Sequence, residues 1–122
     1  MAAFFNKRGD KLKKTVMING KFIPFKSSDK IPKLYKKHFG ISYKRDFAKL
    51  SQIQHMGNPI TMTTDELKKI DFDTLYQICW VFAKNANPFL PKSSKWLEKF
   101  DIFPMTYVLN ELKFLLIDSA KY

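Results

Sequence analysis

The sequence predicts a mostly α-helical protein of the α+β class, with an N-terminal β-hairpin followed by a compact bundle of about five helices. Three observations carry this prediction. Asn19-Gly20 separates two short runs rich in β-branched and aromatic residues. Apolar side chains then recur at helical spacing through most of the remaining chain. With 122 residues, 45% of them hydrophobic, the chain can form one domain with its own core.

The first elements are a basic arm over residues 1–13 and a hairpin that opens the single domain of residues 14–122. The predicted strands are residues 15–18 and 21–25, joined at Asn19-Gly20, because a type I′ turn needs positive φ at both central positions. Pro24 cannot donate a ladder hydrogen bond, which places it on an edge strand or at a strand end.

A short helix is expected over residues 33–39. Ser27, Ser28 or Asp29 are its candidate N-caps, and Pro32 suits its first turn. Gly40 follows the last apolar residue and is a natural left-handed C-terminal residue for this helix.

A second helix is predicted over residues 42–54, followed by a loop over residues 55–60 that contains Gly57 and Pro59. Thr63 and Glu66 then have the spacing of a capping box and open a helix that runs to about residue 70. The expected inward residues of the second helix are Phe47, Leu50 and Ile53.

Residues 72–86 form the strongest helical segment, and we expect it to be the central, most buried helix. Asp71 or Asp73 caps its start, and Pro88 ends it because the residue before a proline is pushed out of the helical region. Its main apolar stripe consists of Phe72, Leu75, Tyr76, Cys79, Phe82, Ala83 and Ala86.

The C-terminal third is predicted to hold two helices. Ser93 or Ser94 begins a short helix that reaches Phe100, and a single last helix starts near Pro104 and runs to about Ala120. The expected inward residues of this last helix are Val108, Leu109, Leu112, Leu115 and Leu116.

The net charge of +11 is concentrated in the front of the chain. Residues 1–50 hold 14 basic and 3 acidic residues, whereas residues 51–122 hold 8 of each. Such a field attracts either nucleic acid or an acidic protein. With only two arginines among the 14, bidentate base recognition is poorly provided for, which favours a solvated basic face or one that faces an acidic protein. The candidate contact residues are Lys36, Lys37, Lys44 and Arg45.

No catalytic, metal or cofactor signature is present, and we expect no enzymatic activity. Cys79 is the single cysteine and lies in the most apolar helix, so it is interpreted as a small buried hydrophobe. His38 and His55 have no second ligand at metal-binding spacing. No apolar run approaches the length of a membrane span, so an intracellular, soluble protein is expected.

The order of these elements resembles the tail assembly chaperones of long-tailed bacteriophages, in particular those of Gram-positive hosts. The resemblance covers roughly residues 15–120, and the basic lead-in is not part of the pattern. Five pieces carry it: the hairpin over residues 16–25; residues 34–41 with 43–47; the apolar helix over residues 75–84; the break over residues 85–91 leading to residues 94–101; and the Leu-rich terminal helix.

The resemblance implies a non-enzymatic protein of the host cytoplasm that coats the tape measure protein before the tail tube assembles. It also implies self-association and a longer form made by translational frameshifting. Helix-in-groove binding needs an apolar groove with polar edges. Trp96, Phe100, Phe103 and Tyr107 are its candidate residues, with ordinary core packing as the other interpretation of each. The alternative function is a small, basic nucleic-acid-binding phage protein.

Overall fold

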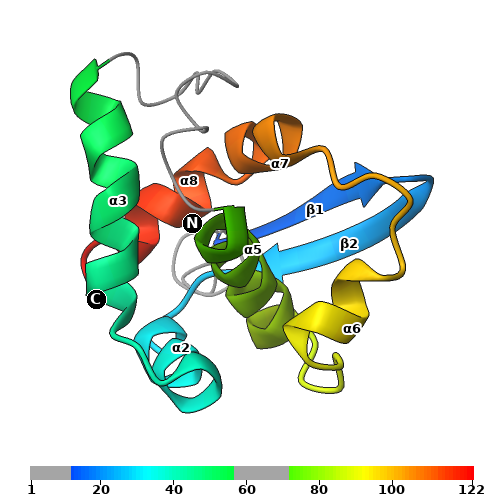
Figure 1. Cartoon of the computed structure of the whole chain (residues 1–122), viewed down its shortest axis with the longest axis horizontal. Helices are drawn as coiled ribbons and strands as arrows, with labels where there is room; N and C mark the ends of the chain where they lie inside the picture. Colours follow the sequence, from blue (N-terminus) through cyan, green and yellow to red (C-terminus); the bar gives the residue numbers. More distant parts are fainter. Residues whose placement is uncertain (1–11, 57–71) are drawn as a thin grey trace, which may run out of the picture.

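The computed structural model describes residues 12–56 and 72–122, and within these the side chains of residues 12–50 and 72–122. The N-terminal hairpin followed by helices confirms the predicted fold class (Figure 1). The described elements are β1 (Lys13–Ile18), β2 (Lys21–Lys26), α2 (Ile31–Phe39), α3 (Tyr43–Met56), α5 (Phe72–Ala86), α6 (Ser93–Leu97), α7 (Met105–Glu111) and α8 (Lys113–Ser119).

Several predictions fall outside the described residues. These are most of the basic arm, the end of the predicted loop, the capping box at Thr63 and the helix that it opens. β1 begins at Lys13, one residue before the predicted domain boundary. α3 extends to Met56, so His55 lies in the helix and not in the predicted loop.

The hairpin forms as the Asn-Gly pair predicts. Asn19 and Gly20 have φ angles of 54° and 79°, the positive values that a type I′ turn requires. The two strands make a two-stranded antiparallel sheet in which every strand is an edge, which accommodates Pro24 opposite Thr15. Val16, Ile18 and Phe25 are buried, and α5 packs against β2.

α2 ends as predicted but begins differently. Gly40 has φ 71° and donates its N–H to the carbonyl of Lys36 at 2.8 Å. The N-cap is Lys30, and the candidate caps at residues 27–29 are wrong. Ser28 instead makes a turn before the helix, because its hydroxyl accepts from the N–H of Lys30 at 3.2 Å.

α5 is the central helix, as its apolar stripe predicts. It contacts β2, α2, α6 and α7. In the predicted stripe, Phe72 is 40% exposed at the first helical position, and Tyr76 and Ala86 are half-buried. The buried residues of α5 are Thr74, Leu75, Ile78, Cys79, Trp80, Val81, Phe82 and Ala83.

The single C-terminal helix is a wrong prediction, because the structure divides it at Leu112. Leu112 has φ −92° and ψ 6°, and its N–H bonds to the carbonyls of Val108 and Leu109. Leu112 itself is fully buried. The break lets α7 pack on α5 and β1 while α8 brings Ser119 to Tyr43, at 2.7 Å between their hydroxyl oxygens.

Candidate functional site

Three of the four predicted groove residues belong to one aromatic cluster. The ring centroid of Trp96 lies 5.1 Å from that of Phe100 and 5.6 Å from that of Phe103. Trp96 also contacts Phe25 of β2 at 6.4 Å in an edge-to-face arrangement. Trp96 is 1% exposed and Phe100 is 8% exposed, so these two rings contribute to the core.

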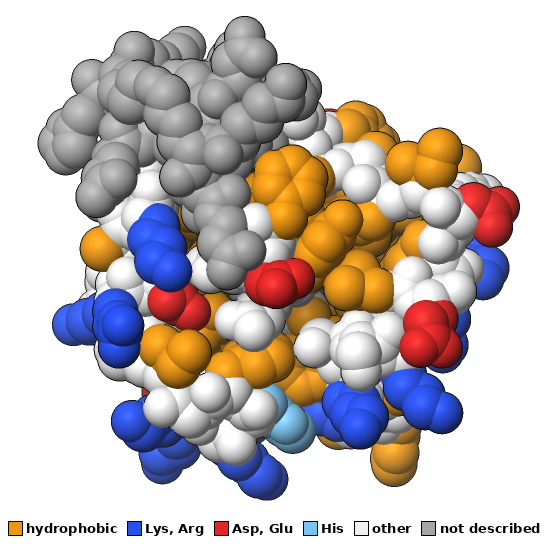
Figure 2. Space-filling view, viewed as in Figure 1, with side chains coloured by type: hydrophobic (Ala, Val, Ile, Leu, Met, Phe, Trp, Pro, Cys, Tyr) orange, Lys and Arg blue, Asp and Glu red, His pale blue; other side chains and the backbone are white. Residues whose placement is uncertain are grey.

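From this cluster the ring contacts continue outward to the surface. Phe103 is half-buried and lies 5.6 Å from Tyr76, which in turn lies 6.1 Å from Phe72. We call Phe72, Tyr76 and Phe103 the aromatic strip. Figure 2 shows hydrophobic side chains gathered between the positions of α5, α6 and α7, with Lys and Arg side chains along the lower edge of this face.

Tyr107 is the predicted groove residue that the structure leaves on the surface, 47% exposed on α7. Phe72 is exposed and Tyr76 is half-buried, although the periodicity of the sequence predicts both on the inward stripe. Their spacing of four residues puts both on one side of α5. The signal for the exposure of Phe72 is its place as the first residue of the helix.

The four candidate basic residues are all exposed, but they do not form one site. Lys36 and Lys37 lie in the last turn of α2, and Lys44 and Arg45 lie at the start of α3. Among them, only Lys37 lines the cavity described next. The sequence therefore located the basic region but not the grouping of its charges.

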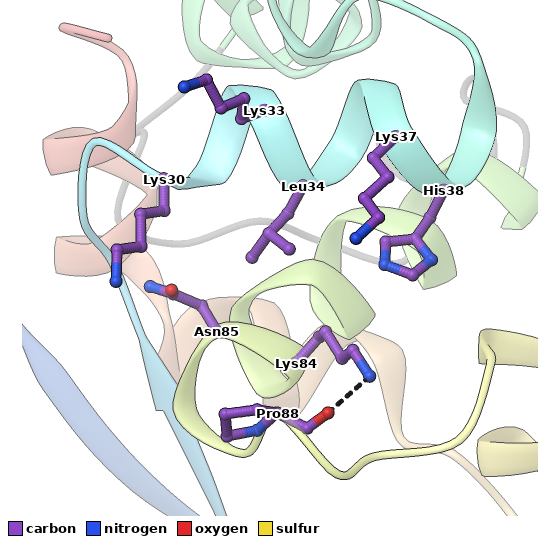
Figure 3. Close-up of a pocket in the computed structure, with 8 residues that line it drawn as sticks. All are labelled: Lys30, Lys33, Leu34, Lys37, His38, Lys84, Asn85 and Pro88. Carbon is purple, nitrogen blue, oxygen red and sulfur yellow. Dashed lines mark hydrogen bonds between the residues drawn. The ribbon is translucent and has the colours of Figure 1, made fainter.

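A cavity of about 650 Å³ lies between α2 and the C-terminal end of α5 (Figure 3). α2 contributes Lys33, Leu34, Lys37 and His38, and its N-cap Lys30 stands at one end. We call this cavity the basic pocket. Its lining residues are Lys30, Lys33, Leu34, Lys37, His38, Lys84, Asn85 and Pro88.

Hydrogen bonds hold the α5 side of the basic pocket. Lys84 donates to the carbonyl oxygens of Pro88 at 2.7 Å and Leu90 at 2.9 Å. Asn85 donates to the carbonyl of Lys26 at 3.0 Å and to the hydroxyl of Ser28 at 3.1 Å. The end of α5 is thereby tied both to its own following loop and to the segment between β2 and α2.

The positive charge of the basic pocket affects the pKa of His38. Its ring centroid lies 4.9 Å from that of Trp80, with the planes at 75°. Partial burial against this ring lowers the pKa of His38 below its usual 6.5, and the charges of Lys84 and Lys37 lower it further.

Cys79 is buried, as the sequence predicts, and its thiol lies 4.0 Å from the sulfur of Met105. Burial raises the pKa of this thiol, which keeps it protonated and unreactive. Within the described part of the chain, no three His, Cys, Asp or Glu side chains gather as metal ligands would. The helices of residues 12–56 and 72–122 include none with the length and apolarity of a membrane span.

No protein-family model matches the chain, and comparisons with curated proteins and with solved structures find no match. The aromatic strip and the basic pocket are the two surfaces of the described residues that suit a binding partner.

Proposed function

We propose that the protein is a non-enzymatic tail assembly chaperone of a long-tailed phage, which binds the tape measure protein in the host cytoplasm. The observation that carries this proposal is the aromatic strip, which an unbroken series of ring contacts joins to the buried Trp96. Such a surface suits the apolar stripe of a helical client.

The rigidity of the strip supports this proposal. Phe103 contacts both Trp96 and Phe100, which are buried, so its position is fixed by the core. A client side chain laid on Phe72 and Tyr76 then removes apolar surface from water with little ordering of the chaperone. Full burial of one large apolar side chain contributes roughly 1.5–3 kcal/mol, so a few such contacts are enough for useful affinity.

The order of the elements is the second support. A hairpin, two helices, a central apolar helix, a proline-containing break and a Leu-rich C-terminal region follow one another in the order that resembles the tail assembly chaperones. The proposal includes association between copies along the client and with a longer frameshifted form. Light scattering of the purified protein measures the association between copies directly.

Co-expression with the tape measure protein tests the proposal. We expect this chain to keep the tape measure protein in the supernatant and to copurify with it. Phe72→Ser should reduce the recovered complex several-fold, whereas Phe89→Ser should not. Phe89 is the matched control because it is 93% exposed and lies in a loop outside the aromatic strip. Equal recovery of the tape measure protein without this chain would overturn the proposal.

A nucleic-acid-binding protein is the second candidate, and the exposed positions of Lys36, Lys37, Lys44 and Arg45 favour it. Titration of DNA and RNA at two salt concentrations separates the two functions. Tight binding that weakens by about tenfold or more between roughly 50 and 200 mM salt would favour nucleic acid, because counterion release dominates such binding.

A further inference from the structure

One face of α2 points its side chains into the basic pocket. Lys30, Leu34 and Lys37 are spaced four and three residues apart, so they lie on the same side of the helix. Figure 3 shows all three directed toward the end of α5 and Pro88. Leu34 occupies the middle, with a lysine on either side, so the pocket combines an apolar centre with cationic ends.

Among the residues that the structure describes, no carboxylate lines the basic pocket. Among the described residues, none of the ion pairs includes a pocket lysine, since those pairs join Lys14, Lys49 and Lys121 to acidic residues elsewhere. The ammonium of Lys84 donates hydrogen bonds to two carbonyl oxygens. Because these acceptors carry no net charge, they do not neutralise the lysine. The field in the cavity is therefore suited to an anion.

The surroundings of the cavity favour a carboxylate on a peptide over a nucleic acid. The aromatic rings next to it contact one another, with Phe39 5.4 Å from Trp80 and 4.9 Å from Tyr35. Tyr35 and Trp80 are almost fully buried and therefore offer no open face on which bases could stack. All the strong cations are lysines, which lack the planar fork used for base recognition. Leu34 and Pro88 instead supply contact for an apolar side chain.

We propose that the basic pocket binds an acidic segment of a protein partner, with one Glu or Asp carboxylate at Lys30, a second at Lys37, and an apolar side chain against Leu34 and Pro88. This site is separate from the aromatic strip, which begins at the opposite end of α5. The two ends of this 15-residue helix are about 20 Å apart at 1.5 Å per residue. The proposal requires a protein partner but not that this partner be a tape measure protein.

Fluorescence anisotropy with purified full-length protein tests this site. The probe is a short fluorescein-labelled peptide of alternating Glu and Leu, compared with the same peptide carrying Gln for Glu. We expect the Lys30→Glu/Lys37→Glu variant to bind the acidic peptide about tenfold or more weakly than the wild type, because two attractions become repulsions.

Lys95→Glu/Lys99→Glu is the matched control, since it makes the same change in net charge on exposed residues at α6. α6 lies across α5 from α2 (Figure 1). We expect the control to keep most of its affinity and the Gln peptide to bind weakly to every form. Circular dichroism and thermal midpoints confirm that both variants are folded.

Three results would overturn the proposal. The first is equal loss of affinity in both charge variants, which would show only a net-charge effect. The second is equal binding of the Gln peptide. The third is a single-stranded DNA oligonucleotide that binds more tightly than the acidic peptide and loses its affinity in Lys30→Glu/Lys37→Glu, which would assign the pocket to nucleic acid. Because the Phe72→Ser co-expression test uses the aromatic strip, either proposal can fail while the other stands.

Discussion

The hydroxyl of Tyr35 donates a 2.6 Å hydrogen bond to Oδ2 of Asp46 and joins α2 to α3 inside the core. Tyr35 is fully buried and Asp46 is 3% exposed. The other carboxylate oxygen of Asp46 lies 3.5 Å from the ammonium of Lys49, which donates at 3.4 Å to the hydroxyl of Thr74 on α5. The buried carboxylate thus connects the three helices that surround it.

Removing the Tyr35 hydroxyl should destabilise the fold. In Tyr35→Phe, Asp46 loses its shortest hydrogen bond while it stays buried, and an unsatisfied buried acceptor costs about 1–3 kcal/mol. Urea denaturation measures the loss in free energy of unfolding. The control is Tyr35→Phe combined with Asp46→Leu, which removes both partners and should cost less than Tyr35→Phe plus Asp46→Leu taken separately. A loss below about 0.5 kcal/mol in Tyr35→Phe would show that the bond gives no net stabilisation.

Alkaline pH should destabilise the protein through its buried tyrosines. Burial, the hydrogen bond to Asp46 and the charge of Asp46 raise the pKa of Tyr35 above its usual 10.0. Burial also raises the pKa of Tyr43. Below pH 10 both phenols are protonated in folded and unfolded chains, and above it the unfolded chain releases protons that the folded chain keeps. The free energy of unfolding should therefore fall as pH rises above 10.

Urea denaturation at a series of alkaline pH values checks this prediction. The decline with pH should be shallower in Tyr43→Phe, which lacks one of the two protected phenols. A free energy of unfolding that does not change between pH 9 and about pH 11 would contradict it, because linkage requires a slope wherever the two states bind different numbers of protons.

Local signals made the front of the fold predictable. Asn19-Gly20 and Gly40 each need a left-handed backbone, and all three residues adopt one. The division of the last helix has no local signal, because no glycine or proline stands near Leu112. It is set by tertiary contacts, since α8 must bring Asp118 to Ser27, at 2.9 Å between Oδ2 and Oγ.

The candidate site was less predictable, because periodicity does not distinguish an aromatic ring in the core from one on the surface. Trp96 and Phe72 both fit an apolar stripe, yet one is 1% exposed and the other 40%. Asp46 was missed as a buried residue, although its spacing from Tyr43 and Leu50 put it on the inward face. Lys84 joins the basic pocket only through the path of the loop after α5, which the sequence does not specify.

The side chain of Asn19 should hold the hairpin turn to the segment before α7. Its amide nitrogen donates to the carbonyl of Ile102 at 2.8 Å, and its oxygen accepts from the N–H of Asp101 at 3.0 Å. Asn19→Gly keeps the positive φ but removes these bonds, so we expect a loss of about 1–2 kcal/mol in the free energy of unfolding. Asn19→Ala should cost about 1–2 kcal/mol more, because alanine is strained at φ 54°.

Gly20→Ala isolates the backbone cost of the turn. Apart from the glycine and its two chain neighbours, no described atom lies within 4 Å of the added Cβ, so the substitution makes no clash there. It should cost only the strain of a left-handed alanine, about 1–2 kcal/mol. Thermal or urea denaturation measures all three variants. If Asn19→Gly were as stable as the wild type, the side-chain bonds to residues 101 and 102 would contribute nothing to the fold.

The pKa of His38 should lie below its usual 6.5, in part because the lysines of the basic pocket lower it. Its ring is partly desolvated by Trp80, and the charges of Lys84 on α5 and Lys37 on its own helix repel a proton. NMR titration of the imidazole protons measures the pKa. Lys84→Met and Lys37→Met should each raise it, and an unchanged pKa in both variants would leave partial burial as the whole cause.

The lowered pKa of His38 also determines how the free energy of unfolding changes with pH. Between the lowered pKa and pH 6.5 the unfolded chain binds a proton at His38 that the folded chain does not, so the free energy of unfolding should fall as pH drops through this window. His38→Gln removes the titration and should flatten that part of the profile. A carboxylate bound at Lys37 would oppose the lysine charges and raise the pKa of His38. Addition of the acidic peptide should therefore shift the imidazole titration toward higher pH, and the Gln peptide should leave it in place.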